Sequence, residues 1–167
     1  KAGTRRPAIA ICSGMTAVNI AAEGACDALA AAKLAQSVGL IVRTIHDCRG
    51  KPSLDSRIAG FLSAARFSGW IILRDLDNDA DCPVAFLQDR KLASPEFGCL
   101  RIAVRSLESW LLADSSGISN WLRVKLKDIP ASPEEIAWPK RELANLAAKS
   151  TNRTIRERMA PRPNDGS

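Results

Sequence analysis

The sequence is poor in the residues that build zinc sites and disulfide frameworks. It has one histidine, His46, and five scattered cysteines that form no C-x-x-C pair. An odd number of dispersed cysteines beside a single histidine matches neither kind of framework, so we expect a reducing, cytoplasmic location. No apolar run approaches the roughly 20 residues that a membrane-spanning helix needs, so no membrane partner is expected.

Two common ligand-binding loops are also missing. Lys51 follows Gly50, but the upstream glycine of a P-loop is absent, so Lys51 is expected at most to contact a phosphate. The acidic segment that begins at Asp75 has the spacing of an EF-hand loop only superficially. Ala80 stands where glycine is needed, and Phe86 stands where the bidentate glutamate belongs.

The chain otherwise has the composition of a soluble globular protein. Its 167 residues are 46% hydrophobic and 25% charged, which is enough for one domain with a buried core. The formal net charge is +6, and ten of the 24 lysines and arginines lie in the last third. The basic residues there are Arg123, Lys125, Lys127, Lys140, Arg141, Lys149, Arg153, Arg156, Arg158 and Arg162. This asymmetry permits a polyanionic partner such as nucleic acid, and a solvated basic helix face explains it equally well.

We expect four segments along the chain. Residues 1–14 are interpreted as a tag or upstream extension, because Met15 resembles a natural start. Residues 15–115 are predicted to form an α/β domain, and residues 116–160 a helical extension packed on it. Residues 161–167 consist of turn-forming residues without apolar content and are predicted to be a disordered tail.

Apolar runs alternate with helix-forming stretches in the predicted α/β domain. Strands are expected at 17–22, 40–46, 70–73 and 100–104, and helices at 25–36, 54–67, 83–91 and 106–114. Ser53 is a candidate N-cap for the second of these helices. This alternation predicts an α/β fold, with a mostly parallel, Rossmann-like sheet of about four strands flanked by helices. Short helices separated by prolines follow as a helical C-terminal extension.

Acidic residues follow three of the expected strands. Glu23 comes after the first strand, Asp75 and Asp77 after the third, and Glu108 in the first turn of a helix with Ser106 as N-cap. The carboxyl ends of parallel strands meet at one edge of the sheet, so these side chains are expected to converge. Two carboxylates at i and i+2 on extended backbone point the same way and repel each other without a cation. The pattern therefore predicts a divalent metal site.

A glutamate after the first strand and an Asp-x-Asp after a later one resemble the Toprim domain, the topoisomerase–primase fold. That fold also occurs in the nucleases named for overcoming lysogenisation defect. Glu23-Gly24-x-x-Asp27 is similar to the glutamate motif, and Asp75-Leu76-Asp77 to the aspartate motif. From about residue 17 to the end, the chain also resembles an uncharacterised bacterial family of Toprim-like proteins. The segments that carry this likeness are 50–51, 70–77, 101–105, 108–114, 129–130 and 139–140.

The resemblance implies metal-dependent phosphoryl transfer, with DNA or RNA hydrolysis as the leading reaction. Glu23 would be the general acid/base or first metal ligand, Asp75 and Asp77 would bind Mg²⁺ or Mn²⁺, and Glu108 would be a ligand of a second ion. The setting would be a phage-defence or mobile-element system, with a partner protein from the same operon. Phosphate or nucleic-acid contacts are expected from Lys51, Arg74, Lys140, Arg153 and Arg156.

Three other readings of the acidic residues stay open. A phosphatase of the haloacid dehalogenase type also uses Asp-x-Asp, but its motif normally follows the first strand. The segment could instead be a solvated aspartate-rich loop that caps helices. The alternative function is a non-catalytic Toprim-like module that binds nucleic acid or a partner protein.

Overall fold

The computed structural model describes residues 17–92 and 98–161. The predicted extension at 1–14, and the predicted tail apart from Pro161, lie outside the described residues. The chain forms two compact units. Within the described residues, the first unit comprises 17–73 and 98–101, and the second comprises 74–92 and 102–161.

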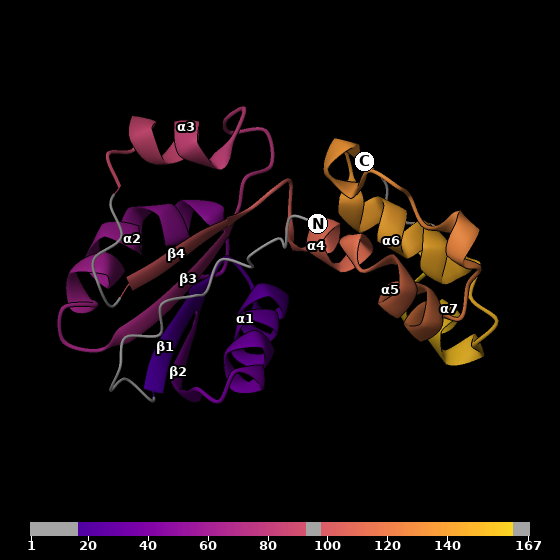
Figure 1. Ribbon diagram of the computed structural model, residues 1–167, viewed down its shortest axis with the longest axis horizontal. Coiled ribbons are helices and arrows are strands. Elements are labelled where there is room, and N and C mark those ends of the chain that lie inside the picture. Colours follow the sequence, from indigo (N-terminus) through magenta and orange to yellow (C-terminus); the bar gives the residue numbers. More distant parts are fainter. Residues whose placement is uncertain (1–16, 93–97, 162–167) are drawn as a thin grey trace, which may run out of the picture. The chain divides into compact units, whose positions relative to one another are not determined.

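Four parallel strands form one sheet, as predicted. The strands are β1 (Ala17–Ala22), β2 (Ile41–Asp47), β3 (Gly69–Asp75) and β4 (Gly98–Ala103), in the order β2-β1-β3-β4 (Figure 1). The central strands β1 and β3 are the most apolar and the most buried, as expected for strands with neighbours on both sides. Ala22 pairs with Leu73, so β1 and β3 run in register to the same edge of the sheet.

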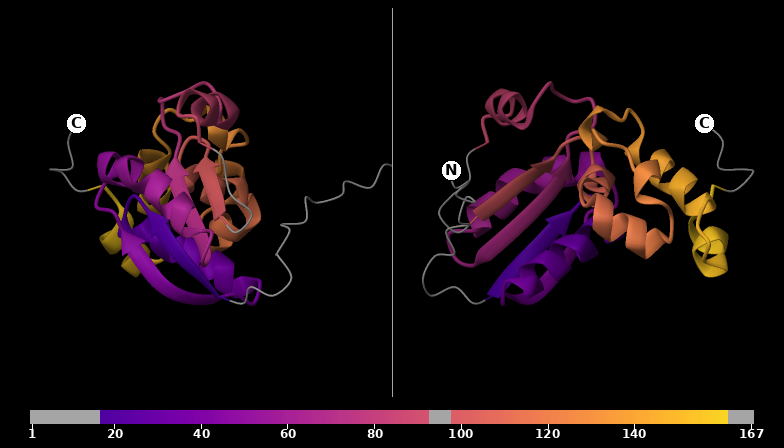
Figure 2. Two further views of the ribbon diagram at one scale, coloured as in Figure 1. Left: turned by 90° about the vertical axis from the view of Figure 1, so that its left-hand side faces the viewer. Right: turned by 45° about the vertical axis from the view of Figure 1, so that its right-hand side comes forward.

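The helices of the first unit cover opposite faces of its strands (Figures 1 and 2). The crossover from β1 to β2 runs in one direction across the sheet, and the crossover from β2 to β3 runs back. Because both crossovers are right-handed, α1 (Ala25–Ser37) and α2 (Lys51–Ala64) are placed on different faces. α1 buries a stripe of alanines, and α2 buries larger apolar side chains that include Leu54, Ile58 and Phe61.

The start of α2 differs from the prediction. Gly50, and not Ser53, is the N-cap residue, and the helix begins at Lys51. Pro52 suits the first helical turn because its missing N–H would have no intrahelical partner there. Gly50 has φ 120°, which residues with a Cβ rarely adopt, and its N–H donates to the carbonyl oxygen of Glu23 at 2.7 Å. This bond joins the turn after β1 to the start of α2.

The second unit contains a helical region, which confirms the prediction of a helical C-terminal extension. The helical elements of the second unit are α3 (Pro83–Asp89), α4 (Leu107–Ala113), α5 (Ser115–Leu122), the 3₁₀ turns Leu126–Asp128 and Pro133–Glu135, α6 (Pro139–Ala148) and α7 (Arg153–Met159). Those from α4 onward form the C-terminal region, whereas α3 lies between β3 and β4 in the chain. The buried core of the region consists of Leu112, Ile118, Leu122, Ile129, Leu143, Leu146 and Ala147. No helix among the described residues is long and apolar enough to cross a membrane.

Candidate functional site: the acidic turn after β3

The acidic turn, residues 75–81, contains four aspartates and directly continues β3. The residues after Asp75 are held by backbone hydrogen bonds to the last residue of β4 and to the chain just after it. The Leu76 N–H donates to the Ala103 carbonyl oxygen at 2.8 Å, and the Asp77 N–H donates to the Arg105 carbonyl oxygen at 2.7 Å. Leu76 is fully buried, so the turn is anchored on the core side as well.

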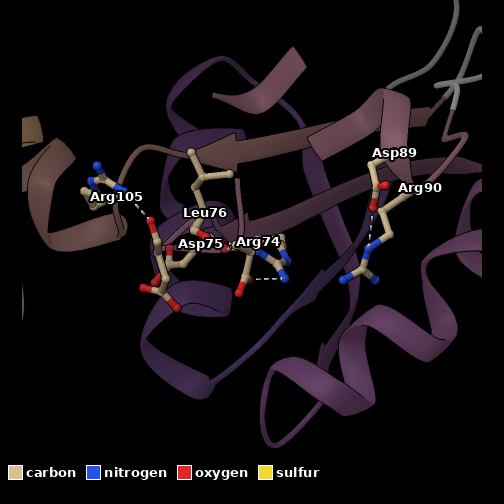
Figure 3. Close-up of polar contacts among 8 residues, drawn as sticks. Arg74, Asp75, Leu76, Asp89, Arg90 and Arg105 are labelled. Atoms are coloured by element: carbon tan, nitrogen blue, oxygen red, sulfur yellow. Dashed lines mark hydrogen bonds and ion pairs between the residues drawn. The ribbon is translucent and has the colours of Figure 1, made fainter. Parts of the chain in front are cut away.

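Arg74, the residue before the turn, is a buried cation that binds both ends of it (Figure 3). Its Nη2 lies 2.6 Å from Oδ2 of Asp79, and its Nη1 donates to the carbonyl oxygens of Asp75 and Leu76. The guanidinium carbon also lies 4.3 Å from the centre of the Phe86 ring. A buried charge is tolerated when it is paired and hydrogen-bonded in this way.

This environment gives Arg74 a structural task. Its side chain is fully buried, and its guanidinium is bound to groups of the turn itself. A guanidinium held in this way supports the turn, and the exposed cations are better placed for a phosphate. The sequence held one signal of burial, because this arginine continues the apolar run of a central strand.

A second arginine supports the middle of the acidic turn. Arg105 Nη1 donates to the carbonyl oxygen of Asp77 at 2.7 Å and to Oδ1 of Asn78 at 3.2 Å (Figure 3). Asp77 has φ 48°, a left-handed conformation that aspartate adopts more readily than most residues with a Cβ. Arg105 was not among the predicted site residues, because its contact with the turn depends on tertiary structure.

Asp75 connects the acidic turn to α4. Its Oδ1 accepts a hydrogen bond from the N–H of Leu107, the first residue of α4, at 2.9 Å. Ser106 is the N-cap residue, as predicted, but its hydroxyl makes no cap hydrogen bond and instead donates to Oε2 of Glu108 at 2.8 Å. A carboxylate at the start of a helix is favoured by the helix dipole. Asp75 therefore accepts a hydrogen bond from the first turn of α4, as the Ser106 side chain was expected to do.

The predicted acidic residues are divided between the two units. Asp75, Asp77 and Glu108 belong to the second unit, and Glu23 lies in the turn between β1 and α1 of the first. Within residues 17–92 and 98–161, no three His, Cys, Asp or Glu side chains form a group that could hold a metal ion. Mg²⁺ is commonly held by only one or two carboxylates together with water and substrate phosphates. Asp75 and Asp77 are carboxylates of the kind that such an ion prefers.

An open hollow of about 600 Å³ lies beside the acidic turn. Residues 78–81 of the turn form one part of its wall, Phe86, Asp89 and Arg90 another, and Arg105 a third. Arg90, the C-cap residue of α3, has its Nε 3.9 Å from Oδ2 of Asp89 (Figure 3). The Arg90 guanidinium also lies 5.1 Å from the centre of the Phe86 ring. Carboxylates and guanidinium groups together suit a charged, polar ligand.

The other predicted basic residues lie on three helices. Lys51 is the first residue of α2, in the first unit. In the second unit, Lys140 is exposed on α6, and α7 carries Arg153 and Arg156. Arg153 is exposed and its Nε pairs with Glu157 at 2.6 Å, whereas Arg156 donates to the Ser150 carbonyl oxygen just after α6. Arg156 thus helps to join α6 and α7.

Comparison of the chain with family models, with curated proteins and with solved structures found no match. The structure establishes an α/β fold with a four-strand parallel sheet and a helical C-terminal region. The likeness to Toprim domains is accordingly a resemblance of sequence motifs alone.

Proposed function

We propose that the protein is a metal-dependent phosphoryl-transfer enzyme, a nuclease that acts on DNA or RNA. The observation that carries the proposal is the acidic turn at the carboxyl end of a central parallel strand, where open α/β sheets bind their ligands. Arg105 and the buried Arg74 hold the backbone of this turn. Fixed carboxylates at such an edge are suited to a hard divalent cation.

Asp75 and Asp77 would hold Mg²⁺ or Mn²⁺. The bound ion would neutralise phosphate charge and activate the attacking water. The hydrogen bond from the Leu107 N–H orients the Asp75 carboxylate, as outer-shell hydrogen bonds commonly do for metal ligands. The motif resemblance adds Glu23 as general acid/base and Glu108 as a ligand of a second ion.

The hollow beside the turn would receive the phosphate group. Arg90 and Arg105 in its wall would offset phosphate charge, and the basic last third of the chain, with Lys140 and Arg153, would extend the contact along a nucleic acid. The motif resemblance further suggests a cytoplasmic phage-defence or mobile-element system with a partner protein encoded in the same operon.

One observation favours the second candidate, a non-catalytic binding module. Asp75 accepts a hydrogen bond from α4, and Asp79 is paired with Arg74, so both carboxylates have structural tasks. A turn built in this way is stable as an acidic loop. The two candidate functions differ in whether metal binding and catalysis depend on Asp77.

The purified protein should be incubated with DNA and RNA in Mg²⁺, Mn²⁺ or EDTA. We expect metal-dependent cleavage that is abolished by both Glu23→Gln and Asp77→Asn, because the ion needs charged ligands and the reaction a proton acceptor. Glu134→Gln, on an exposed 3₁₀ turn, is the matched control and should cleave normally. Full activity of Glu23→Gln alone would refute the role of Glu23. Full activity of both site variants would trace the cleavage to a contaminating nuclease.

A further inference from the structure

The second unit exposes a tryptophan directly ahead of three cations. Trp121 is the penultimate residue of α5 and is 55% exposed. The exposed residues Arg123, Lys125 and Lys127 follow it within six positions. Trp121 is not part of the helical core, to which its neighbour Leu122 belongs. An accessible aromatic ring beside cations is the combination that proteins use to bind single-stranded nucleic acids.

The backbone of this segment is held in place. Arg123 ends α5 with φ 56°, and its carbonyl oxygen accepts hydrogen bonds from both the N–H and the hydroxyl of Thr151 at 3.3 Å. The Val124 N–H donates to the Ser119 carbonyl oxygen at 3.1 Å, and the Ser119 hydroxyl donates to the Val124 carbonyl oxygen at 2.9 Å. The left-handed Arg123 and the Val124–Ser119 bond form a common helix-ending motif, so they fix where α5 stops and where the segment begins.

The three cations of the segment are not engaged in ion pairs with other described residues. In the part of the chain that the structure describes, Arg123, Lys125 and Lys127 form no ion pair with an acidic side chain. Arg153 on α7, by contrast, is paired with Glu157. Three cations within five residues repel one another and create a positive potential, which a polyanion relieves.

We propose that the segment Trp121–Lys127 binds single-stranded nucleic acid. A base stacks on the exposed Trp121 ring, and the phosphates contact Arg123, Lys125 and Lys127. Single strands are preferred because the bases of a duplex are already stacked and do not offer their faces to a side chain. The inference names the substrate class of the proposed nuclease and in that respect rests on the proposed function, but the binding itself requires no metal.

The binding is measured by fluorescence anisotropy of a labelled 15-nucleotide oligothymidylate and of a labelled 15-base-pair duplex, in EDTA and over a range of salt concentrations. The intact chain should bind the single strand more tightly. Trp121→Ala should weaken that binding by about 5- to 150-fold and leave the duplex affinity unchanged, and Trp121→Phe should restore most of the loss. Replacing Arg123, Lys125 and Lys127 together by alanine should flatten the salt slope by about 2.

Two controls separate stacking from misfolding and from nonspecific attraction. The helix content and melting temperature of Trp121→Ala should equal those of the intact chain, because the side chain lies outside the core. Phe67→Ala removes an aromatic ring in the first unit that is 91% exposed, and it should leave the single-strand affinity unchanged. An equal loss in Phe67→Ala would overturn the assignment to Trp121.

The proposal is overturned if Trp121→Ala binds the single strand as the intact chain does, or loses single strand and duplex equally. Binding of the chain to vesicles of phosphatidylserine and phosphatidylcholine is measured as well, to test an anionic lipid surface as the alternative ligand. Vesicle binding that depends on Trp121, without oligonucleotide binding, would assign the segment to an anionic lipid surface and overturn the proposal. Binding that depends on Trp121 without cleavage would support this inference and refute the nuclease. Cleavage by the intact chain, together with unchanged single-strand binding by Trp121→Ala, would support the nuclease and refute this inference.

Discussion

Replacing Arg74 by methionine tests the buried centre of the acidic turn. The substitution keeps a long side chain but removes the donors to the Asp75 and Leu76 carbonyl oxygens and the cation above the Phe86 ring. A buried acceptor left without a partner costs about 1–3 kcal/mol, and a desolvated cation–π contact contributes about 2 kcal/mol. Part of this loss of stability is offset, because methionine carries no charge that has to be desolvated on folding.

The net cost of Arg74→Met should be about 3 kcal/mol, which lowers the melting temperature by about 6–12 °C for a chain of this length. Arg74→Lys should lose most of the same stability, because an ammonium group cannot serve the same spread of acceptors as a guanidinium. Asp79→Ala should cost less, about 1–2 kcal/mol, since this carboxylate is 34% exposed and solvent screens the pair. Arg66→Met, at an exposed position, is the control and should change stability by less than about 0.5 kcal/mol.

Urea denaturation followed by circular dichroism measures these differences. The double variant of Arg74 and Asp79 completes a mutant cycle, in which the two losses should not add because the side chains are in contact at 2.6 Å. If Arg74→Met were as mild as the Arg66 control, the guanidinium could not be buried as described. Additive losses would show that Asp79 is not its partner.

Three further predictions concern the metal, a thiol and a helix cap. A hundredfold excess of Mg²⁺ or Mn²⁺ over its Kd should stabilise the fold by about 2.7 kcal/mol, and Asp77→Asn, but not Glu134→Gln, should shrink the resulting shift in a thermal melt. Burial raises the pKa of the Cys48 thiol above its usual value of 9.0, with Arg57 opposing, so its proton is held more tightly in the folded state. Stability should therefore be lost as the pH rises past 9, and at pH 8 alkylation mapped by mass spectrometry should modify Cys48 only on unfolding. Asp114→Ala removes the acceptor of the Gly117 N–H at the start of α5 and should cost about 1 kcal/mol in urea.

The α/β fold could be predicted because local pattern and chain order contain most of the information. The runs at 17–22 and 70–73 are short, apolar and followed by helix formers, and strands occur within a few residues of each predicted range. Right-handed crossovers then imply parallel pairing. The strand order β2-β1-β3-β4 was not predicted, because it depends on which strands lie side by side and not on the sequence of any one strand.

The position of the acidic turn after an apolar strand could be predicted from the sequence, but the residues that support the turn could not. Asp75 and Asp77 were recognised from their spacing after an apolar strand. The tasks of Arg74 and Arg105 depend on contacts with residues up to 28 positions away, which no local pattern contains. The start of α2 was missed for a similar reason, because the φ of 120° at Gly50 is coupled to a hydrogen bond with Glu23 in the preceding turn.

The contacts of Arg74 decide which aspartates of the acidic turn a metal ion could still stabilise. Four aspartates in seven residues predict a strong mutual repulsion that a cation would relieve. The protein supplies one such cation itself, because the guanidinium of Arg74 neutralises Asp79 at 2.6 Å. The repulsion that a divalent ion can still relieve is therefore left among Asp75, at the end of β3, and Asp77 and Asp81 in the turn that follows. Metal-induced stabilisation should consequently depend on Asp77 and survive in Asp79→Asn, even though the latter variant starts from a less stable fold.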